Sequence, residues 1–388
     1  MKLVISKEQL KDALAITSKA LPKAVLTPER GHLLFIVKDG ILKVSGTNND
    51  LKAQYIVSLI SSDGDISFTV DPKILDKLIS KIDQDNISLE FESSNLTLKV
   101  YTSEDESSFN TLQTFPTDKM LTVGAVDKDL SVTYPINREL LLRVLSYSWK
   151  YLDTSKEENK KYDFIVINNG VSFSANGLNK MGFLVTADFK GINNLKIRKQ
   201  AIPIFIFILN KLQDKTVILG EMDNDIIIKT ESSNVYFSCL KSTVEASKIN
   251  LDHLKKDGPY VEINRIELIK KLNRLTATRD TATTSGIEVT LSGAGDSSYL
   301  DMALLANLKA KERIQCKRVN DTSTSDVTHI LDYKLFLMEV SSFIQENINL
   351  YINENNSFFK VHEVIKDDDL SLKYITVGVG SYSRIIKK

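Results

Sequence analysis

Three stretches of the sequence share one pattern of apolar and polar positions. They are "NISLEFESSNLTLK" (residues 86–99), "TVILGEMDNDIIIK" (residues 216–229) and "NINLYINENNSFFK" (residues 347–360). Each has an apolar strand pattern, breaks at a polar turn and then returns, which is typical of a β-hairpin. Their first apolar residues, Ile87, Val217 and Ile348, lie 130 and 131 positions apart. We therefore predict three copies of one module along the chain.

A helix is predicted before each hairpin. In "DPKILDKLISKI" (residues 71–82), Asp71 suits an N-cap, Pro72 suits the first turn, and apolar residues recur on one helical face. The equivalent stretch "AIPIFIFILNKL" (residues 201–212) is by itself compatible with a buried strand, part of a membrane span or a helix. Its β-branched and aromatic residues favour a strand, but the repeat predicts a helix that starts near Pro203. Residues 331–343 are the third copy.

The other half of each module repeats as well. Helix starts are predicted in residues 6–14, 137–145 and 264–272, and pairs of strands follow each of them. Joints are expected in "FPTDKMLTVGAVDKD" and "KKDGPY", where Pro, Gly and charged residues gather. The predicted fold class is α+β, with three modules at residues 1–127, 128–257 and 258–388.

The composition, 42% hydrophobic and 26% charged, is that of a soluble globular protein. No apolar run reaches the roughly 20 residues that span a bilayer. The first residues also lack the apolar core of a secretory signal, so a cytoplasmic location and no membrane partner are expected. Cys239 and Cys316 lie far apart in the sequence, and we expect both to be reduced, buried thiols.

Motifs that would support catalysis are missing from the sequence. The four histidines are isolated, and there is no HExxH, CxxC, GxSxG or Walker pattern. The stretch "GVGSYS" from Gly378 matches only the start of a dinucleotide-binding loop and is expected to follow the last strand. We therefore expect no enzymatic activity, no cofactor and no metal.

Charge is segregated although the whole chain is neutral, with 50 basic and 50 acidic residues. The six predicted helices carry a net charge of +7, which leaves −7 on the remainder. In residues 71–82 the basic residues Lys73, Lys77 and Lys81 follow the face opposite the apolar one. Such a stripe is either an ordinary solvated face or part of a repeated basic surface that meets nucleic-acid phosphates without reading sequence.

Over essentially its whole length the sequence resembles the bacterial DNA sliding clamp, the beta subunit of DNA polymerase III. The similarity is carried by "MKLVISKEQLKDALAITSKALPK", "LLFIVKDGILKVSGTN", "FTVDPKILDKLISKI" and "YPINRELLLRVLSYS". The resemblance implies a head-to-tail homodimer of three-domain subunits that closes a ring, with helices lining the hole and sheets outside. It also implies that double-stranded DNA passes through the ring, and that the replicative polymerase and the clamp loader bind through short peptides.

The basic stripes and the resemblance together give the candidate site residues. The candidate DNA-binding residues are Lys11, Lys23, Lys73, Lys77, Lys81, Arg143, Trp149, Lys150, Tyr151, Arg198, Lys199, Lys211, Lys270, Lys271 and Arg274. The implied partner-peptide cleft contains Tyr162, Gly177, Leu178, Asn179, Met181, Val377 and Val379. The implied dimer interface contains Phe109, Leu112, Thr278 and Arg279. Trp149 is alternatively an ordinary core residue.

The sequence departs from the family pattern at several of these places. Leu178 and Asn179 stand where the family has His and Arg, and Ile204 follows Pro203 where a basic residue is usual. Thr278 and Arg279 replace an expected apolar pair, which predicts weaker ring closure.

The end of the chain also differs from the family. Residues 377–380, "VGVG", replace a Met-Pro-Met-Arg-like end, and residues 381–388 extend past the usual terminus as a cationic tail. We expect this tail to cover the cleft, to contact acidic partner residues, or to be disordered without a role.

Two other functions are compatible with the sequence. One is a clamp-like accessory ring of a mobile element, and the other is a three-module scaffold that binds only protein. Retention on closed circular DNA separates both clamp functions from the scaffold.

Overall fold

The computed structural model describes the chain except for residues 25–26, 49, 121–131, 153–163, 177–179, 233, 243–257, 278–285, 306, 321–325, 352–357, 367–372 and 387–388. The chain forms two compact units. Unit 1 comprises residues 1–142 and 200–242, and unit 2 comprises residues 143–199 and 243–388. The division passes through the predicted middle module, which shares a sheet with the first module in unit 1 and with the third in unit 2. Residues 121–129 of the first predicted joint and residues 255–257 of the second lie outside the described residues.

Unit 1 contains two sheets, in the orders β5-β1-β7-β8-β9 and β10-β15-β16-β17-β4-β3-β2-β6. The first sheet is built from β1 (Lys2–Ser6), β5 (Ser61–Ser62), β7 (Asn86–Glu92), β8 (Thr97–Tyr101) and β9 (Phe109–Gln113). The second is built from β2 (Leu33–Lys38), β3 (Ile41–Thr47), β4 (Leu51–Ser58), β6 (Ile66–Val70), β10 (Val132–Asn137), β15 (Thr216–Met222), β16 (Asp225–Thr230) and β17 (Val235–Leu240).

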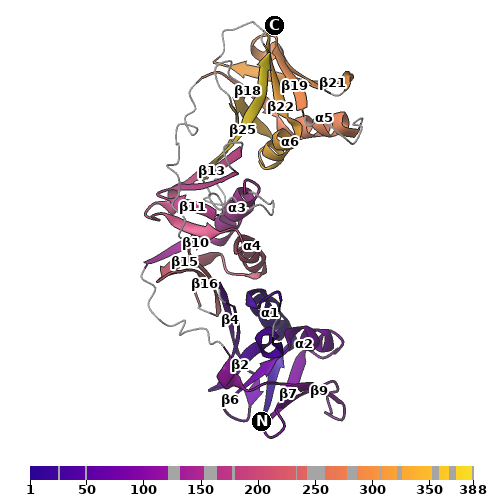
Figure 1. Cartoon of the computed structure of the whole chain (residues 1–388), viewed down its shortest axis with the longest axis vertical. Coiled ribbons are helices and arrows are strands. Elements are labelled where there is room, and N and C mark those ends of the chain that lie inside the picture. Colours follow the sequence, from indigo (N-terminus) through magenta and orange to yellow (C-terminus); the bar gives the residue numbers. More distant parts are fainter. Residues whose placement is uncertain are drawn as a thin grey trace. The chain divides into compact units, whose positions relative to one another are not determined.

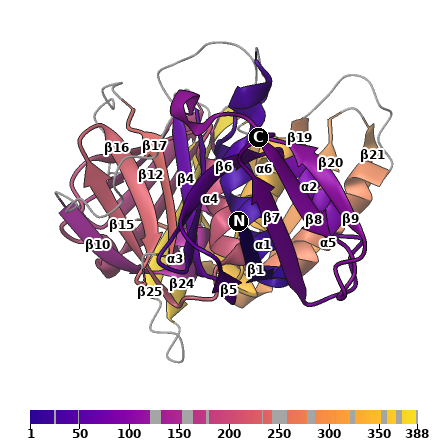
Figure 2. The same ribbon diagram turned by 90° about the horizontal axis from the view of Figure 1, so that it is seen from below.

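The helices of unit 1 are α1 (Lys7–Thr17), α2 (Pro72–Ile79) and α4 (Ile202–Lys211). A fourth helix, α3 (Arg138–Trp149), begins in unit 1 and continues into unit 2. Figure 1 shows α1, α2 and α4 gathered on one side of unit 1. Figure 2 shows α1 with β4 and β6 to one side of it and β8 and β9 to the other.

The first module has one core that joins both helices to both sheets. Leu10 of α1 and Leu75 of α2 are fully buried in it. Phe68 stacks between Phe35 and Phe91, with ring centroids 5.3 and 5.2 Å away. Because each fully buried side chain of this kind stabilises the fold by roughly 1.5–3 kcal/mol, this core fixes the two helices against the sheets.

The stretch at residues 201–212 is a helix, as the repeat predicts. Pro203 lies in its first turn, and Phe205 and Ile208 are buried on one face. The ring of Phe205 meets Phe237 of β17 edge-on, with centroids 5.0 Å apart. Burial of this face against the sheet outweighs the strand propensity of the individual residues.

Unit 2 contains one sheet in the order β14-β11-β12-β13-β25-β22-β19-β20-β21-β18-β23-β24, and β24 also pairs with β25. Its strands from the middle module are β11 (Phe164–Asn168), β12 (Val171–Asn176), β13 (Lys180–Thr186) and β14 (Leu195–Arg198). Its strands from the third module are β18 (Tyr260–Asn264), β19 (Gly286–Ser292), β20 (Ser298–Leu304), β21 (Asn307–Val319), β22 (Val327–Asp332), β23 (Asn347–Tyr351), β24 (Phe358–Lys366) and β25 (Lys373–Ile386). The third-module helices are α5 (Arg265–Ala277) and α6 (Tyr333–Ser341). Among the described residues, no helix is long and apolar enough to cross a membrane.

The three modules match residue by residue at their helices. The first residue of α1, α3 and α5 donates its backbone N–H to an equivalent carbonyl: Lys7 to Asp85 (2.8 Å), Arg138 to Lys215 (2.8 Å) and Arg265 to Glu346 (2.7 Å). Each acceptor lies the same number of positions after the N-cap of α2, α4 or α6, namely Asp71, Ala201 and Asp332. A position in one helix therefore has a defined counterpart in the other two modules.

The end of the chain is a strand and not a tail. Figure 1 shows β25 running lengthwise between β13 and the strands around β22. Residues 374–380 of β25 pair with β13, and residues 382–386 pair with β22. For residues 381–386 the alternative of a disordered tail is therefore wrong, and so is the expectation of a last strand that ends before Gly378. That this end covers the cleft or contacts acidic partner residues stays a prediction. The open edge of β22 supplies backbone partners that the charge pattern of the tail could not reveal.

Candidate nucleic-acid interface and assembly edges

Helix α2 and the turn that follows it present three lysines to solvent. Asp71 caps the helix by accepting the N–H of Lys73 (2.8 Å), which fixes where the helix starts. Lys73, Lys77 and Lys81 are all exposed. Lys73 and Lys77 lie about one turn apart on α2, and Lys81 follows in the turn after Ile79, so the basic residues predicted from the sequence lie at the surface.

The basic residues of α5 divide into two kinds. Lys270 is exposed, and the Arg274 side chain is 68% exposed with Glu312 at 3.9 Å. The Lys271 ammonium instead donates to the carbonyl of Arg313 in β21 (2.6 Å) and has Glu312 at 3.9 Å. The Lys271 side chain of α5 is therefore held against β21, while Lys270 and Arg274 remain available to a ligand.

The remaining predicted cations of unit 1 and β14 lie at different depths. Lys23 is exposed, Lys11 is half-buried, and Lys211 has its ammonium 3.5 Å from the carboxylate of Asp12. Arg198 and Lys199 are half-buried at the end of β14.

Arg143 was predicted to face DNA, but its side chain is turned toward the third module. Its guanidinium donates to the carbonyl of Ser342 (2.9 Å) and to the buried carboxylate of Glu363 (3.4 Å). A guanidinium held by a buried carboxylate is not free to bind phosphate. The prediction is wrong because charge counted along one helix does not reveal which face the next module covers.

Tyr151, also predicted as a DNA contact, is fully buried. Its hydroxyl donates to a carboxylate oxygen of the buried Glu339 and lies 2.9 Å from the hydroxyl of Tyr147. Burial, followed by the negative charge of Glu339, raises the pKa of Tyr151 well above 10. A Cβ added at Gly182 in β13 would lie 2.4 Å from the Tyr151 ring, so the strand is packed directly on that ring. Tyr151 is a core residue, and the prediction that it touches DNA is wrong.

The neighbours of Tyr151 are closer to the surface. Trp149 is half-buried and Lys150 is exposed. Partial desolvation, followed by repulsion from Arg143, lowers the pKa of the Lys150 ammonium. Sequence reasoning missed Glu339 and Glu363, although an acid inside the apolar stretch "LFLMEVSSF" was a visible sign of a buried partner for Glu339.

The predicted peptide cleft is only partly described. Tyr162, Gly177, Leu178 and Asn179 lie outside the described residues. Met181 is half-buried in β13, and its backbone pairs with Val379, while Val377 pairs with Phe183. The backbones of Met181, Val377 and Val379 are therefore brought together at the junction of β13 and β25.

Strands β9 and β21 are among those that leave a backbone edge open in the described residues. Strand β9 is the last strand of its sheet; Phe109 in it is 50% exposed and Leu112 is half-buried. Strand β21 pairs with β20 along one edge, but β18 covers the other edge only at residues 316–319. The sequence pointed to β9 and missed β21. Thr278 and Arg279 lie outside the described residues.

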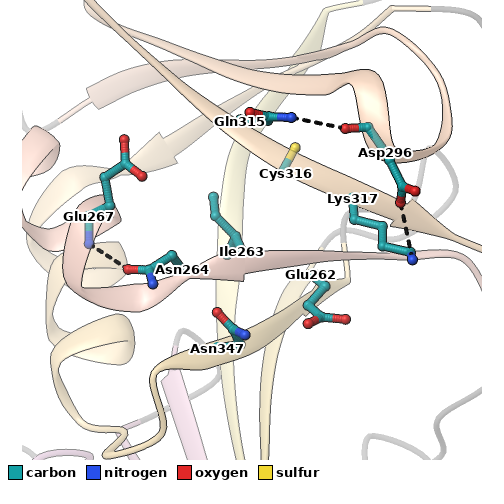
Figure 3. A pocket seen from close by; sticks show the side chains of 9 residues that line it. All are labelled: Glu262, Ile263, Asn264, Glu267, Asp296, Gln315, Cys316, Lys317 and Asn347. Atoms are coloured by element: carbon teal, nitrogen blue, oxygen red, sulfur yellow. Dashed lines mark hydrogen bonds and ion pairs between the residues drawn. The ribbon is translucent and has the colours of Figure 1, made fainter.

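A pocket of about 320 Å³ lies in the third module, and Figure 3 shows the side chains that line it. It is lined mainly by polar side chains, and the Lys317 ammonium lies 3.1 Å from Asp296 within it. None of the predicted site residues lines this pocket. Among the described residues, no three His, Cys, Asp or Glu side chains are grouped to hold a metal ion.

Residues 1–123 match the family model of the DNA polymerase III beta subunit, N-terminal domain. A comparison with characterised proteins by sequence gives no match. The structure is similar to the DNA polymerase III subunit beta of Pseudomonas aeruginosa, with a TM-score of 0.80 and 17% identity over 99% of this chain and 100% of that one.

Two further structures are also similar over nearly the whole chain. The sliding clamp of Bacillus subtilis gives a TM-score of 0.80 at 13% identity, covering 99% of both chains. The beta subunit of Thermotoga maritima gives 0.75 at 16% identity, covering 99% of this chain and 100% of that one. The resemblance predicted from the sequence is confirmed: the chain has the three-module α+β fold of the bacterial sliding clamps, at low sequence identity.

Proposed function

We propose that this chain is a DNA sliding clamp, in which two copies join head to tail into a ring around duplex DNA and tether the replicative polymerase. We further propose that it catalyses no reaction and acts in the cytoplasm. The clamp fold and the match of the first module to the polymerase beta subunit support this proposal.

One observation carries the proposal. Strand β17 of the middle module pairs with β4 of the first, and β25 of the third pairs with β13 of the middle. Strands β4, β13 and β21 are counterparts in the three modules, as are β9, β17 and β25. At both internal junctions, the last strand of one module therefore pairs with the β4 counterpart of the preceding module. The same pairing leaves β21 of the third module to pair with β9 of a second copy. Two identical chains make this junction twice and so close the assembly.

The mass of the protein in solution tests this junction. Sedimentation should give twice the chain mass, and Phe109→Ala should weaken the dimer at least tenfold, because it removes a half-exposed aromatic from both junctions. Ile60→Ala is the matched control, since Ile60 is 58% exposed but lies outside β9 and β21. A monomer at all concentrations, or equal effects of both variants, would contradict the proposal.

DNA binding in the proposed ring comes from weak phosphate contacts on the helices. Lys23 and Lys73 are exposed and belong to the predicted lining. Replacing both with Ala should reduce the slope of log affinity against log salt by up to about two, because two phosphate contacts are lost. Replacing the exposed Lys38 and Lys190 should leave the slope unchanged. Equal slopes for both double variants would show that the helical lysines are only solvated.

We also propose that the polymerase and the clamp loader bind through short peptides near the junction of β13 and β25. The backbones of Met181, Val377 and Val379 meet there. Calorimetry with a generic clamp-binding peptide tests this, and Met181→Ala should weaken binding. The accessory ring of a mobile element and the protein scaffold are separated from this function by a pull-down of polymerase and loader subunits and by retention on circular DNA.

A further inference from the structure

At the two internal joints of the chain, the helices also meet through equivalent positions. In unit 1, α1 of the first module meets α4 of the middle module, with Asp12 3.5 Å from Lys211 and the Lys19 ammonium 4.3 Å from the ring centroid of Phe207. In unit 2, the middle-module helix α3 meets the third module, with the Arg143 guanidinium 2.9 Å from the Ser342 carbonyl.

These contacts fall at equivalent positions. Asp12 and Arg143 are each the sixth residue of the first helix of their module. Lys211 and Ser342 each lie ten positions after the N-cap of the second helix. In unit 1 this position pair brings two opposite charges together, and in unit 2 it places the Arg143 guanidinium against the backbone carbonyl of Ser342, so neither joint brings two like charges together.

The third joint can only be made between two copies, with α5 of one chain against α2 of the other. The sixth residue of α5 is Lys270, and the residue ten positions after the N-cap of α2 is Lys81. Both are exposed in the single chain. In α2, Ile74 is 49% exposed, whereas its counterparts Ile204 of α4 and Leu335 of α6 are half-buried. The side of α2 that carries Ile74 is therefore more exposed in the single chain than the equivalent sides of α4 and α6, and in the proposed ring a second copy covers it.

We propose that the joint between two copies of this chain carries a like-charged pair, Lys270 against Lys81 of the second copy, where both internal joints carry a compensated pair. This inference rests on the proposed ring of two chains. Two ammonium groups at this position repel each other, so ring closure is opposed by the charges that also line the helices. DNA phosphates neutralise both lysines, and closure and DNA binding therefore strengthen each other.

Other charges near this joint do not cancel the pair. Arg274 lies one turn after Lys270 and has Glu312 at 3.9 Å, and Glu267 on α5 is 3.3 Å from Lys271. Asp76 and Asp83 flank Lys81 in sequence, but their positions are not those that make the internal contacts described above.

The test measures the dimer dissociation constant by sedimentation without DNA. For the unmodified chain, raising NaCl from about 0.05 M to about 0.5 M should tighten the dimer, because salt screens the repulsion. Lys81→Glu should tighten it about tenfold at low salt, or about threefold for each of the two joints, because it creates the opposite-charge pair found at Asp12 and Lys211. Lys270→Glu should act alike, and the double variant, which again carries like charges, should return to the original value.

The matched control is Lys334→Glu, the same charge change two positions after the N-cap of α6, where the residue is exposed. It should leave the dissociation constant unchanged. A short linear duplex should tighten the dimer of the unmodified chain more than that of Lys81→Glu. If Phe109→Ala weakens the dimer while Lys81→Glu behaves as Lys334→Glu does, the like-charged pair is overturned and the proposed ring stands. If the unmodified chain does not dimerise, the ring itself fails.

Discussion

The hydroxyl of Tyr151 illustrates how a single polar atom decides between a core role and a surface role. It donates to Glu339, which is 0% exposed. We expect Tyr151→Phe to lower the free energy of unfolding by about 1–3 kcal/mol, because the buried carboxylate loses a donor. DNA retention of the folded variant should not change. Urea denaturation at neutral pH measures the first effect, and a DNA-binding assay measures the second.

Tyr299→Phe is the matched control for that experiment, because Tyr299 is half-buried on β20 and its ring lies 5.2 Å from the Arg313 guanidinium. It should change stability by less than about 0.5 kcal/mol. If Tyr151→Phe loses DNA retention while its free energy of unfolding hardly changes, Tyr151 contributes to DNA binding and not to the core.

His329 makes the stability of unit 2 depend on acidity. It is fully buried on β22, and burial lowers its pKa from 6.5 to about 4. The His329 imidazole binds a proton near pH 6.5 in the unfolded chain but only near pH 4 in the folded chain. Proton binding therefore does not reduce the free energy of unfolding above pH 6.5, and it reduces that free energy progressively as the pH falls from 6.5 toward 4. The loss amounts to up to about 3 kcal/mol. Denaturation curves at several pH values should show a shallower decline for His329→Gln, and parallel declines would contradict this assignment.

At the scale of elements, the repeat carried more information than local propensity. It predicted α4 from α2 despite the strand-like "IPIFIFIL", because both helices bury one face against equivalent strands. All three predicted hairpins are present, as β7–β8, β15–β16 and β23–β24. A structure predicted for one copy of the repeat applies to the other copies because equivalent residues contact equivalent neighbours.

The candidate site was less predictable for the same physical reason. Lys73, Lys77 and Lys81 are exposed in this chain, as the charge pattern along the sequence predicts, and their binding to DNA stays a prediction. Arg143 occupies an equivalent kind of stripe, but the third module covers it. A sequence gives the face on which a residue lies, and only the packing of modules gives what covers that face.

The extension of β25 should stabilise the third module. Residues 382–386 add backbone pairs to β22, whose edge would otherwise be exposed. A chain that ends at Ser381 should unfold several degrees lower than one that ends at Ile386, and amides of β22 should exchange faster in it. The chain ending at Ile386 is the control, because it loses only two terminal residues. Equal melting temperatures would show that the extension contributes nothing to the fold.

At the scale of the whole molecule, the zero net charge of the chain and the proposed closed ring together predict how the protein is retained on DNA. The chain has 50 basic and 50 acidic residues, so contacts between an open chain and DNA are few and are screened by salt. A closed ring is retained by topology, which salt does not affect. We expect protein assembled on nicked circular DNA to remain bound during gel filtration at about 0.5 M NaCl, and to be lost once the DNA is cut. Phe109→Ala should be lost from both forms, because its rings open. Equal loss of the unmodified protein from circular and linear DNA would mean that charge alone holds it, and the clamp function would then be rejected.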